Sequence, residues 1–126
     1  MEIKRIQTPN APAAIGPYSQ GCIAGNFLYL SGQGGIDPAA AQVVEGGIEA
    51  QAERTMQNIR ALLAEAGADF SSVVKTTCFL ADMADFAAFN AVYAKYFTEK
   101  PARSCVAVKQ LPLGLLCEVE VIAYLG

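Results

Sequence analysis

Residues 47–80 read GIEAQAERTMQNIRALLAEAGADFSSVVKTTCFL, and this stretch decides the fold class. In residues 47–66 the apolar side chains recur at the spacing of an amphipathic helix, and Gly67 supplies a natural helix stop. Residues 72–80 are rich in Val, Thr and Phe and predict a strand. A long helix that leads into such a strand is expected to cross over between strands of one sheet.

Three strands are predicted before this unit. They cover residues 3–8, 19–24 and 27–31, and Gly25-Asn26 between the last two is suited to a tight hairpin turn. The chain therefore opens with an antiparallel meander.

A second helix and two more strands are predicted after it. Asp82 can cap a helix that runs to about Phe97. Residues 102–109 and 117–125 read as strands on either side of a turn, so we expect them to pair antiparallel. The order β-β-β-α-β-α-β-β predicts an α+β domain with a mixed sheet and both helices on one face.

Composition narrows the class of protein. The chain has 126 residues, 53% apolar and 17% charged, which predicts a single domain over residues 1–126 whose surface is partly covered by another subunit. No apolar run is long enough for a membrane span, and the N-terminus lacks the pattern of a secretory signal, so we expect a cytoplasmic protein that does not bind membranes.

Charge and metal ligands exclude further classes of function. The net charge is −3 and the basic residues are scattered, which argues against a nucleic-acid partner. There is no histidine, and the four cysteines are far apart without a C-x-x-C pair. We therefore expect no metal and no cofactor, and cysteines that serve mainly as core residues.

The strand from residue 102 carries the first candidate site. Alternation places Arg103 and Cys105 on one face, and a hairpin with the last strand would bring Glu118 or Glu120 alongside them. This pair has three readings: a structural ion pair, two solvated residues on an exposed face, or an arginine that binds a substrate carboxylate while the glutamate handles a water molecule. Asn90, which falls in the apolar stripe of the second helix, also needs a polar partner.

Two other motifs are weaker evidence for a functional site when each is taken alone. Tyr18 follows a Gly-Pro turn, and the stretch that begins Ser31-Gly32 is rich in glycine but lacks the lysine and helix of a phosphate loop. A serine triad would need a histidine, and Cys105 as a nucleophile would have no base beside it. Packing therefore remains an alternative for each of these residues.

Four blocks together resemble the RidA/YjgF family of enamine/imine deaminases along nearly the whole chain. They are residues 11–18 (APAAIGPY), 30–33 (LSGQ), 74–77 (VKTT), and 101–106 (PARSCV) followed by Leu111-Pro112 and residues 118–120 (EVE). The spacing of Arg103, Cys105 and Glu118 is the most specific of these features. One departure is the segment 98–100, which is shorter than in many relatives and is expected to alter the mouth of the cleft and the choice of substrate side chain.

The resemblance implies a chorismate-mutase-like fold, a homotrimer with a substrate cleft at each subunit interface, and a role in metabolite damage control. The implied reaction is hydrolysis of 2-iminobutanoate and 2-iminopropanoate to 2-keto acids and ammonia. The implied catalytic residues are Arg103, which binds the carboxylate, Glu118, which positions the water, and Tyr18. The implied substrate-binding residues are Arg103, Cys105 through its backbone, Ser31, Gly32 and Asn90.

Two other functions stay open in this family. The first is a non-catalytic module that binds small metabolites or acts as a holdase chaperone. The second is ribonuclease activity, which the acidic composition and the scattered basic residues disfavour.

Overall fold

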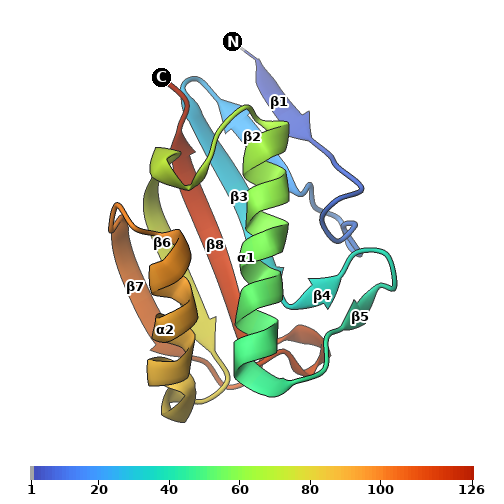
Figure 1. Cartoon of the computed structure of the whole chain (residues 1–126). Coiled ribbons are helices and arrows are strands. Elements are labelled where there is room, and N and C mark those ends of the chain that lie inside the picture. The colour runs from blue at the N-terminus through green and yellow to red at the C-terminus, as the bar shows by residue number, and fades with distance from the viewer. Residues whose placement is uncertain (1) are drawn as a thin grey trace.

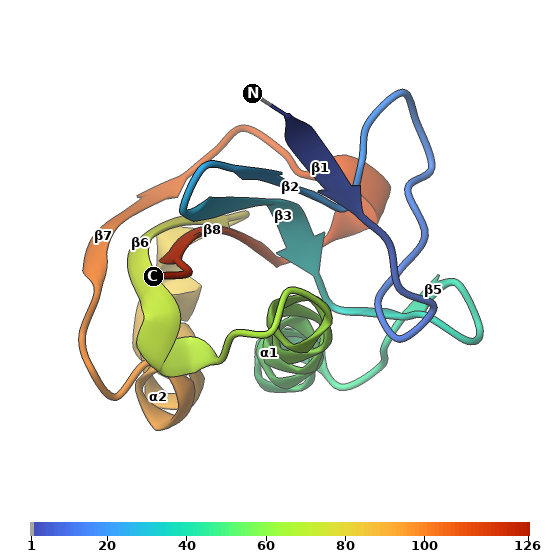
Figure 2. The same ribbon diagram turned by 90° about the horizontal axis from the view of Figure 1, so that it is seen from above.

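The computed structural model describes residues 2–126, in which one face of a six-stranded sheet is covered by two helices (Figures 1 and 2). The strand order is β1-β2-β3-β8-β6-β7; β6 and β7 run parallel, and all other neighbours are antiparallel. The main strands are β1 (Ile3–Ile6), β2 (Gly21–Ala24), β3 (Phe27–Gly34), β6 (Val73–Leu80), β7 (Ala102–Ala107) and β8 (Cys117–Tyr124), and the helices are α1 (Gly47–Glu65) and α2 (Phe86–Tyr96). The predicted α+β class, with a mixed sheet and both helices on one face, is confirmed.

Smaller elements fill the connections. The strands β4 (Ile36–Asp37) and β5 (Gln42–Val43) form a separate hairpin, and 3-10 turns cover Phe70–Ser72, Met83–Asp85 and Pro112–Gly114. The hairpin was not predicted, because two-residue strands leave no alternation to detect.

Helix α1 supplies the largest part of the core. Its buried apolar side chains lie on the predicted stripe and have no exposed surface: Ala52, Met56, Ile59, Leu62 and Leu63. Burial of each larger side chain of this set contributes about 2 kcal/mol. The helix ends before Gly67, whose φ of +77° is a conformation that glycine adopts without strain.

Polar side chains of α1 also fix the end of β3. The Asn58 side chain donates hydrogen bonds to the carbonyl oxygens of Gly34 (3.0 Å) and Ile36 (2.9 Å). A Cβ atom at Gly35 would lie 2.6 Å from the Cα of Gln51, so only glycine permits this approach. The Gln51 side chain in turn accepts a 2.8 Å hydrogen bond from the Leu116 N–H, just before β8. These contacts hold the ends of β3 and β8 that carry part of the candidate site.

Helix α2 is tied to the sheet by a buried polar contact. Asp82 accepts a 2.9 Å hydrogen bond from the Ala84 N–H and caps a 3-10 turn that leads directly into α2, so the predicted helix start is confirmed with one extra turn. The Tyr93 hydroxyl lies 2.7 Å from the hydroxyl of Thr76 on β6. Tyr93 is 8% exposed and Thr76 is fully buried, so this pair fixes the height of α2 over the sheet.

The predicted antiparallel pairing of the last two strands is wrong. β7 pairs with β6 in parallel, and β8 lies between β3 and β6. β6, α2 and β7 form a second crossover unit, and residues 108–116 carry the chain past β6 to the middle of the sheet. As a consequence, β6 separates the strand of Arg103 from the strand of Glu118.

Neither α1 nor α2 covers the second face of the sheet (Figure 2). Apolar side chains on this face are 38–48% exposed: Phe27, Tyr29, Val106 and Tyr124. The rings of Phe27 and Tyr124 contact each other with centroids 5.3 Å apart. Among residues 2–126, no helix has both the length and the apolar character needed to cross a bilayer.

Candidate active site

Arg103 projects from β7 toward helix α2. Its register partner on β6 is the fully buried Thr76, which places the arginine on the helix-covered face. Arg103 Nη1 donates a 2.7 Å hydrogen bond to Asn90 Oδ1, and its Cζ lies 4.8 Å from the Tyr93 ring centroid and 5.6 Å from that of Phe86. Residues 86, 90 and 93 are on one face of α2, so a single helix face holds the guanidinium. The partner that Asn90 was expected to need is Arg103.

Every group that holds Arg103 is neutral. The one ion pair among residues 2–126 joins Lys95 of α2 to Glu53 of α1, and neither Glu118 nor Glu120 contacts the guanidinium. The structural salt bridge considered for Arg103 is therefore absent from the described chain. A guanidinium that is fixed in place but keeps its charge uncompensated is suited to bind a carboxylate through its remaining N–H groups.

Glu118 lies in a different hollow, at the start of β8. This hollow has a volume of about 390 Å³, and its lining includes Tyr18, Gly32 and Leu113. A Cβ atom at Gly32 would lie 2.5 Å from Glu118 Oε2, so the absence of a side chain there makes room for the carboxylate. Burial raises the pKa of Glu118 above its ordinary value, and the neighbouring Glu120 raises this pKa further. A carboxylate in such surroundings is a better proton acceptor than one in water.

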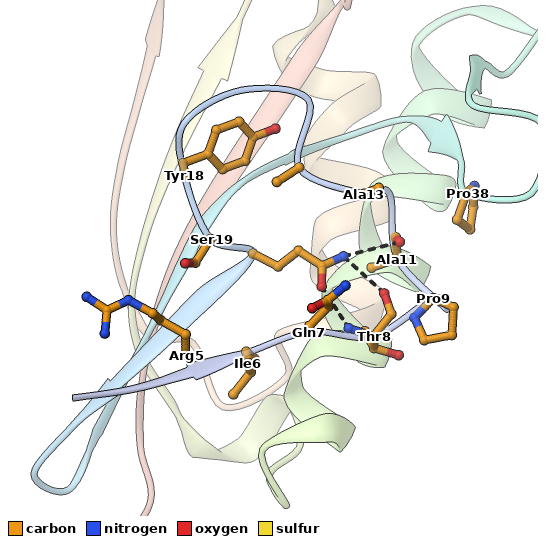
Figure 3. A pocket seen from close by; sticks show the side chains of 12 residues that line it. Arg5, Ile6, Gln7, Thr8, Pro9, Ala11, Ala13, Tyr18, Ser19 and Pro38 are labelled. Carbon is orange, nitrogen blue, oxygen red and sulfur yellow. Dashed lines mark hydrogen bonds between the residues drawn. The ribbon is translucent and has the colours of Figure 1, made fainter. Parts of the chain in front are cut away.

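Tyr18 is carried by a loop that Gln20 holds in place. Gln20 is 4% exposed; its amide oxygen accepts from the Thr8 N–H (2.7 Å), and its NH₂ donates to the carbonyls of Thr8 (3.1 Å), Pro12 (2.8 Å) and Ala11 (3.3 Å). Figure 3 shows the bonds to Thr8 and Ala11, with Tyr18 on the loop beyond them. The Tyr18 hydroxyl accepts a 3.3 Å hydrogen bond from the Ile15 N–H, and its side chain is 50% exposed.

Ser31 supports the same loop. Its hydroxyl donates a 2.6 Å hydrogen bond to the Ser19 carbonyl, and its N–H donates to the Gln20 carbonyl at 3.0 Å. The serine hydroxyl is therefore used to anchor the segment that carries Tyr18. The family resemblance implies that Ser31 binds substrate, whereas in the described chain its hydroxyl supports the loop.

Cys105 lies on the same face as Arg103, opposite Cys78 of β6. Burial raises the pKa of the Cys105 thiol, so the thiol is poorly suited to act as a thiolate nucleophile. Cys78 and Cys117 are fully buried core residues, and all four cysteines are free. Within residues 2–126, no group of three carboxylate or thiol side chains is placed to hold a metal ion.

The expected site residues fall into two groups on opposite faces of the sheet. Arg103 and Cys105 face the helices, and Asn90 of α2 lies against Arg103. Glu118 pairs with Phe79, which alternates with buried residues of β6, so Glu118 projects from the other face together with Gly32 and the Tyr18 loop. The expected contact between Arg103 and Glu118 within one chain is therefore wrong.

Sequence reasoning missed three residues that build these groups. Phe86 and Tyr93 share the face of Asn90 by their spacing, but apolar residues in a helical stripe indicate packing and not contact with an arginine. Gln20 gave no signal, because it falls near the start of the predicted strand 19–24, where a polar residue usually faces solvent.

Comparisons with known proteins bear on what these groups do. The family model described as "Endoribonuclease L-PSP" matches residues 8–125. The chain is 51% identical over 120 residues to a RutC family protein of Pyrococcus horikoshii, which covers 94% of this chain and 95% of that protein. It is 48% identical over 122 residues to the 2-iminobutanoate/2-iminopropanoate deaminase of Capra hircus, which covers 96% of this chain and 89% of that protein. The crystal structure of RidA from an Antarctic Psychrobacter species matches with a TM-score of 0.92 at 44% identity, over 96% of this chain and 98% of that one.

Proposed function

Because this chain belongs to the endoribonuclease L-PSP family, which includes the RidA, YjgF and RutC proteins, we propose that it hydrolyses reactive 2-imino acids to 2-keto acids and ammonia. The observation that carries the proposal is the arginine at position 103, which is held by neutral groups alone and has no carboxylate partner in the described chain. The deaminase name of the goat relative, at 48% identity, supports the same reaction. 2-Iminobutanoate and 2-iminopropanoate are the substrates we propose first.

We propose further that the active unit is a homotrimer with a cleft at each subunit interface. The structure of one chain supports this proposal, because Arg103 and Glu118 lie on opposite faces of the sheet. Both residues can act on one small substrate only if two copies of the chain meet. The exposed apolar side chains on the uncovered sheet face offer surface for such an assembly. The number of subunits is taken from the family resemblance.

The cleft would then combine two half-sites. Arg103 of one subunit, held in place by Asn90, binds the carboxylate of the imino acid, with Cys105 lending its backbone. Glu118, Gly32 and the Tyr18 loop of the neighbouring subunit close over the imine carbon.

The reaction needs little chemical activation, because an imine carbon is already electrophilic. Arg103 orients the substrate, whose imine nitrogen is protonated, and Glu118 accepts a proton as water adds its oxygen to that carbon and the C=N electron pair moves to nitrogen, which leaves an uncharged amine. The resulting amine nitrogen takes up a proton from Glu118, Tyr18 or the attached water network, and the C–N bond breaks with release of ammonia. Loss of the hydroxyl proton leaves the 2-keto acid. Proton transfers of this kind contribute on the order of 10² to 10⁴ in rate.

We also propose a cytosolic location. All four cysteines are free, two of them in the core, as is typical of proteins in a reducing compartment.

The deciding experiment generates 2-iminopropanoate or 2-iminobutanoate in situ, with an amino acid oxidase or a threonine dehydratase, and follows keto acid release with and without the protein. The wild type should accelerate release, and Arg103→Ala should lower kcat/KM by at least about 100-fold, because two charge-assisted hydrogen bonds are lost. Absence of acceleration by the wild type, or full activity in Arg103→Ala, contradicts the proposal. A holdase or binding module would instead keep its activity in an aggregation assay when Arg103 is replaced.

A further inference from the structure

The hollow beside Arg103 contains a second positive charge. It has a volume of about 460 Å³, lies at the C-terminal end of α2, and is lined by Asn90, Tyr93, Phe97, Lys100 and Arg103 among others. No acidic side chain lines it. The reaction derived above uses only Arg103, so Lys100 is left without a role.

The backbone at Lys100 is held in an uncommon conformation. Its φ is +54°, in the left-handed region that favours glycine or asparagine, and its N–H donates a 3.2 Å hydrogen bond to the Phe97 carbonyl at the end of α2. For a residue with a side chain this conformation is strained. It allows the short segment 98–100 to turn from the helix into β7. The position thus carries a lysine where glycine would be easier for the backbone.

The two cations are close enough to share one small ligand. Lys100 and Arg103 are three residues apart, so their Cα atoms lie within about 10 Å of each other. Arg103 is fixed by Asn90 and the two rings, whereas Lys100 is exposed and its long side chain is free to adjust. The guanidinium fork matches one carboxylate bidentately, and the ammonium group can pair with another as a point charge.

We propose that the site prefers 2-imino acids that carry a second carboxylate on their side chain, and that Lys100 recognises this second carboxylate. The inference rests on the proposed imine hydrolysis and specifies its substrate class. The preference is modest, because an ion pair to an exposed lysine contributes up to about 1 kcal/mol, which corresponds to about fivefold in affinity. Salt weakens it.

Two imines of different charge test the inference. An oxidase that acts on aspartate generates 2-iminosuccinate, and one that acts on alanine generates 2-iminopropanoate. The wild type should have the higher kcat/KM for 2-iminosuccinate. In Lys100→Ala the ratio of the two kcat/KM values should fall about fivefold, mainly through KM for the diacid.

Two further variants isolate the charge from the backbone. Lys100→Gly removes the charge and relieves the positive φ, so it should lower the ratio as Lys100→Ala does. Lys109→Ala removes an exposed lysine outside the hollow and should leave the ratio as in the wild type. An unchanged ratio in both Lys100 variants, or a wild type that prefers 2-iminopropanoate, overturns the inference.

The inference and the proposed function can fail separately. If the wild type accelerates neither imine, the proposed function is wrong. In that case the dissociation constants of oxaloacetate and pyruvate, measured by calorimetry, still decide the role of Lys100. Tighter binding of oxaloacetate that is lost in Lys100→Ala supports it, and equal dissociation constants overturn it.

Discussion

Arg103 and Asn90 are joined by a 2.7 Å hydrogen bond from Nη1 to Oδ1, and Asn90 is the one side chain with a polar bond to the guanidinium among residues 2–126. The asparagine positions the arginine without neutralising it. The identity of this residue, an amide and not a carboxylate, therefore decides whether Arg103 can bind an anion.

Asn90→Asp tests this relationship, because it keeps the size and the acceptor oxygen but adds a negative charge. We expect an unchanged or higher melting temperature and a rise in KM of at least about 10-fold, since an ion pair now competes with the substrate carboxylate. Asn90→Ala is the matched control, and it should raise KM less because the guanidinium loses its anchor but keeps its charge. An Asn90→Asp enzyme with the KM of the wild type would show that Arg103 does not bind the carboxylate.

Gly32 is expected to be needed for catalysis more than for folding. In Gly32→Ala the new Cβ would lie 2.5 Å from Glu118 Oε2, and the flexible end of that side chain would move away. A displacement of about 1 Å at a reacting group can lower kcat about 100-fold. Gly25→Asn, in a turn with φ of +60° and open space around it, is the control that should leave kcat unchanged. A Gly32→Ala enzyme with normal kcat would remove Glu118 from the mechanism.

The charge of Glu120 is expected to shift the pH dependence of the reaction. Glu120 raises the pKa of Glu118, and the proton-accepting form of Glu118 is the deprotonated one. Glu120→Gln should therefore lower that pKa and move the acidic limb of the kcat/KM profile to lower pH, by less than about one unit. The measurement is kcat/KM for 2-iminopropanoate across the acidic range. If the acidic limb stays at the same pH in Glu120→Gln and persists in Glu118→Gln, the group that titrates there is not Glu118.

The features of the fold that depend on local sequence patterns could be predicted from the sequence. Helical spacing before Gly67, alternation in the strands and the cap at Asp82 each leave a trace within a few residues, so the two helices, the six main strands and the fold class were predicted. The partner of β7 depends on which strand the chain reaches after residues 108–116, and no local signal encodes that. The error in pairing produced the error about the contact between Arg103 and Glu118.

The family resemblance selected residues that lie in two separate hollows of one chain. The spacing of Arg103 and Glu118 along the sequence indicates that they belong to one family pattern. It does not indicate whether they meet within one copy of the chain or between two copies. The residues that hold them, such as Tyr93 behind Arg103 and Gln20 behind Tyr18, act through packing and backbone contacts. Those contacts become visible only in three dimensions.

Glu53 connects the two helices and is expected to contribute stability that depends on pH. Its carboxylate pairs with Lys95 and accepts a 2.5 Å hydrogen bond from the Tyr96 hydroxyl, and these bonds lower its pKa below the ordinary value of 4.5. A lowered pKa in the folded state means that the stabilisation is complete above the ordinary value and is lost as the pH falls through the folded one. Because both side chains are at least one-third exposed, Glu53→Gln should cost only about 0.5 kcal/mol at pH 7.

Urea unfolding at pH 7 and near pH 3 measures this effect, with Glu65→Gln on the exposed side of α1 as the control. The difference between wild type and Glu53→Gln should shrink at the lower pH. An equal difference at both pH values would mean that the contact acts through packing and not through charge.

Mixed assemblies test whether the two half-sites come from different subunits. Arg103→Ala and Glu118→Gln should each be inactive alone, because each lacks one half of every cleft. When the two variants are unfolded together in equal amounts and refolded, a cleft is complete where an intact Arg103 of one subunit meets an intact Glu118 of the next. Random assembly into closed rings gives this combination in about one quarter of the clefts, so about 25% of wild-type activity should return. If both residues acted within one chain, every chain would carry one defect and no activity would return. Refolding each variant alone, and the wild type in parallel, provides the baseline and the full signal.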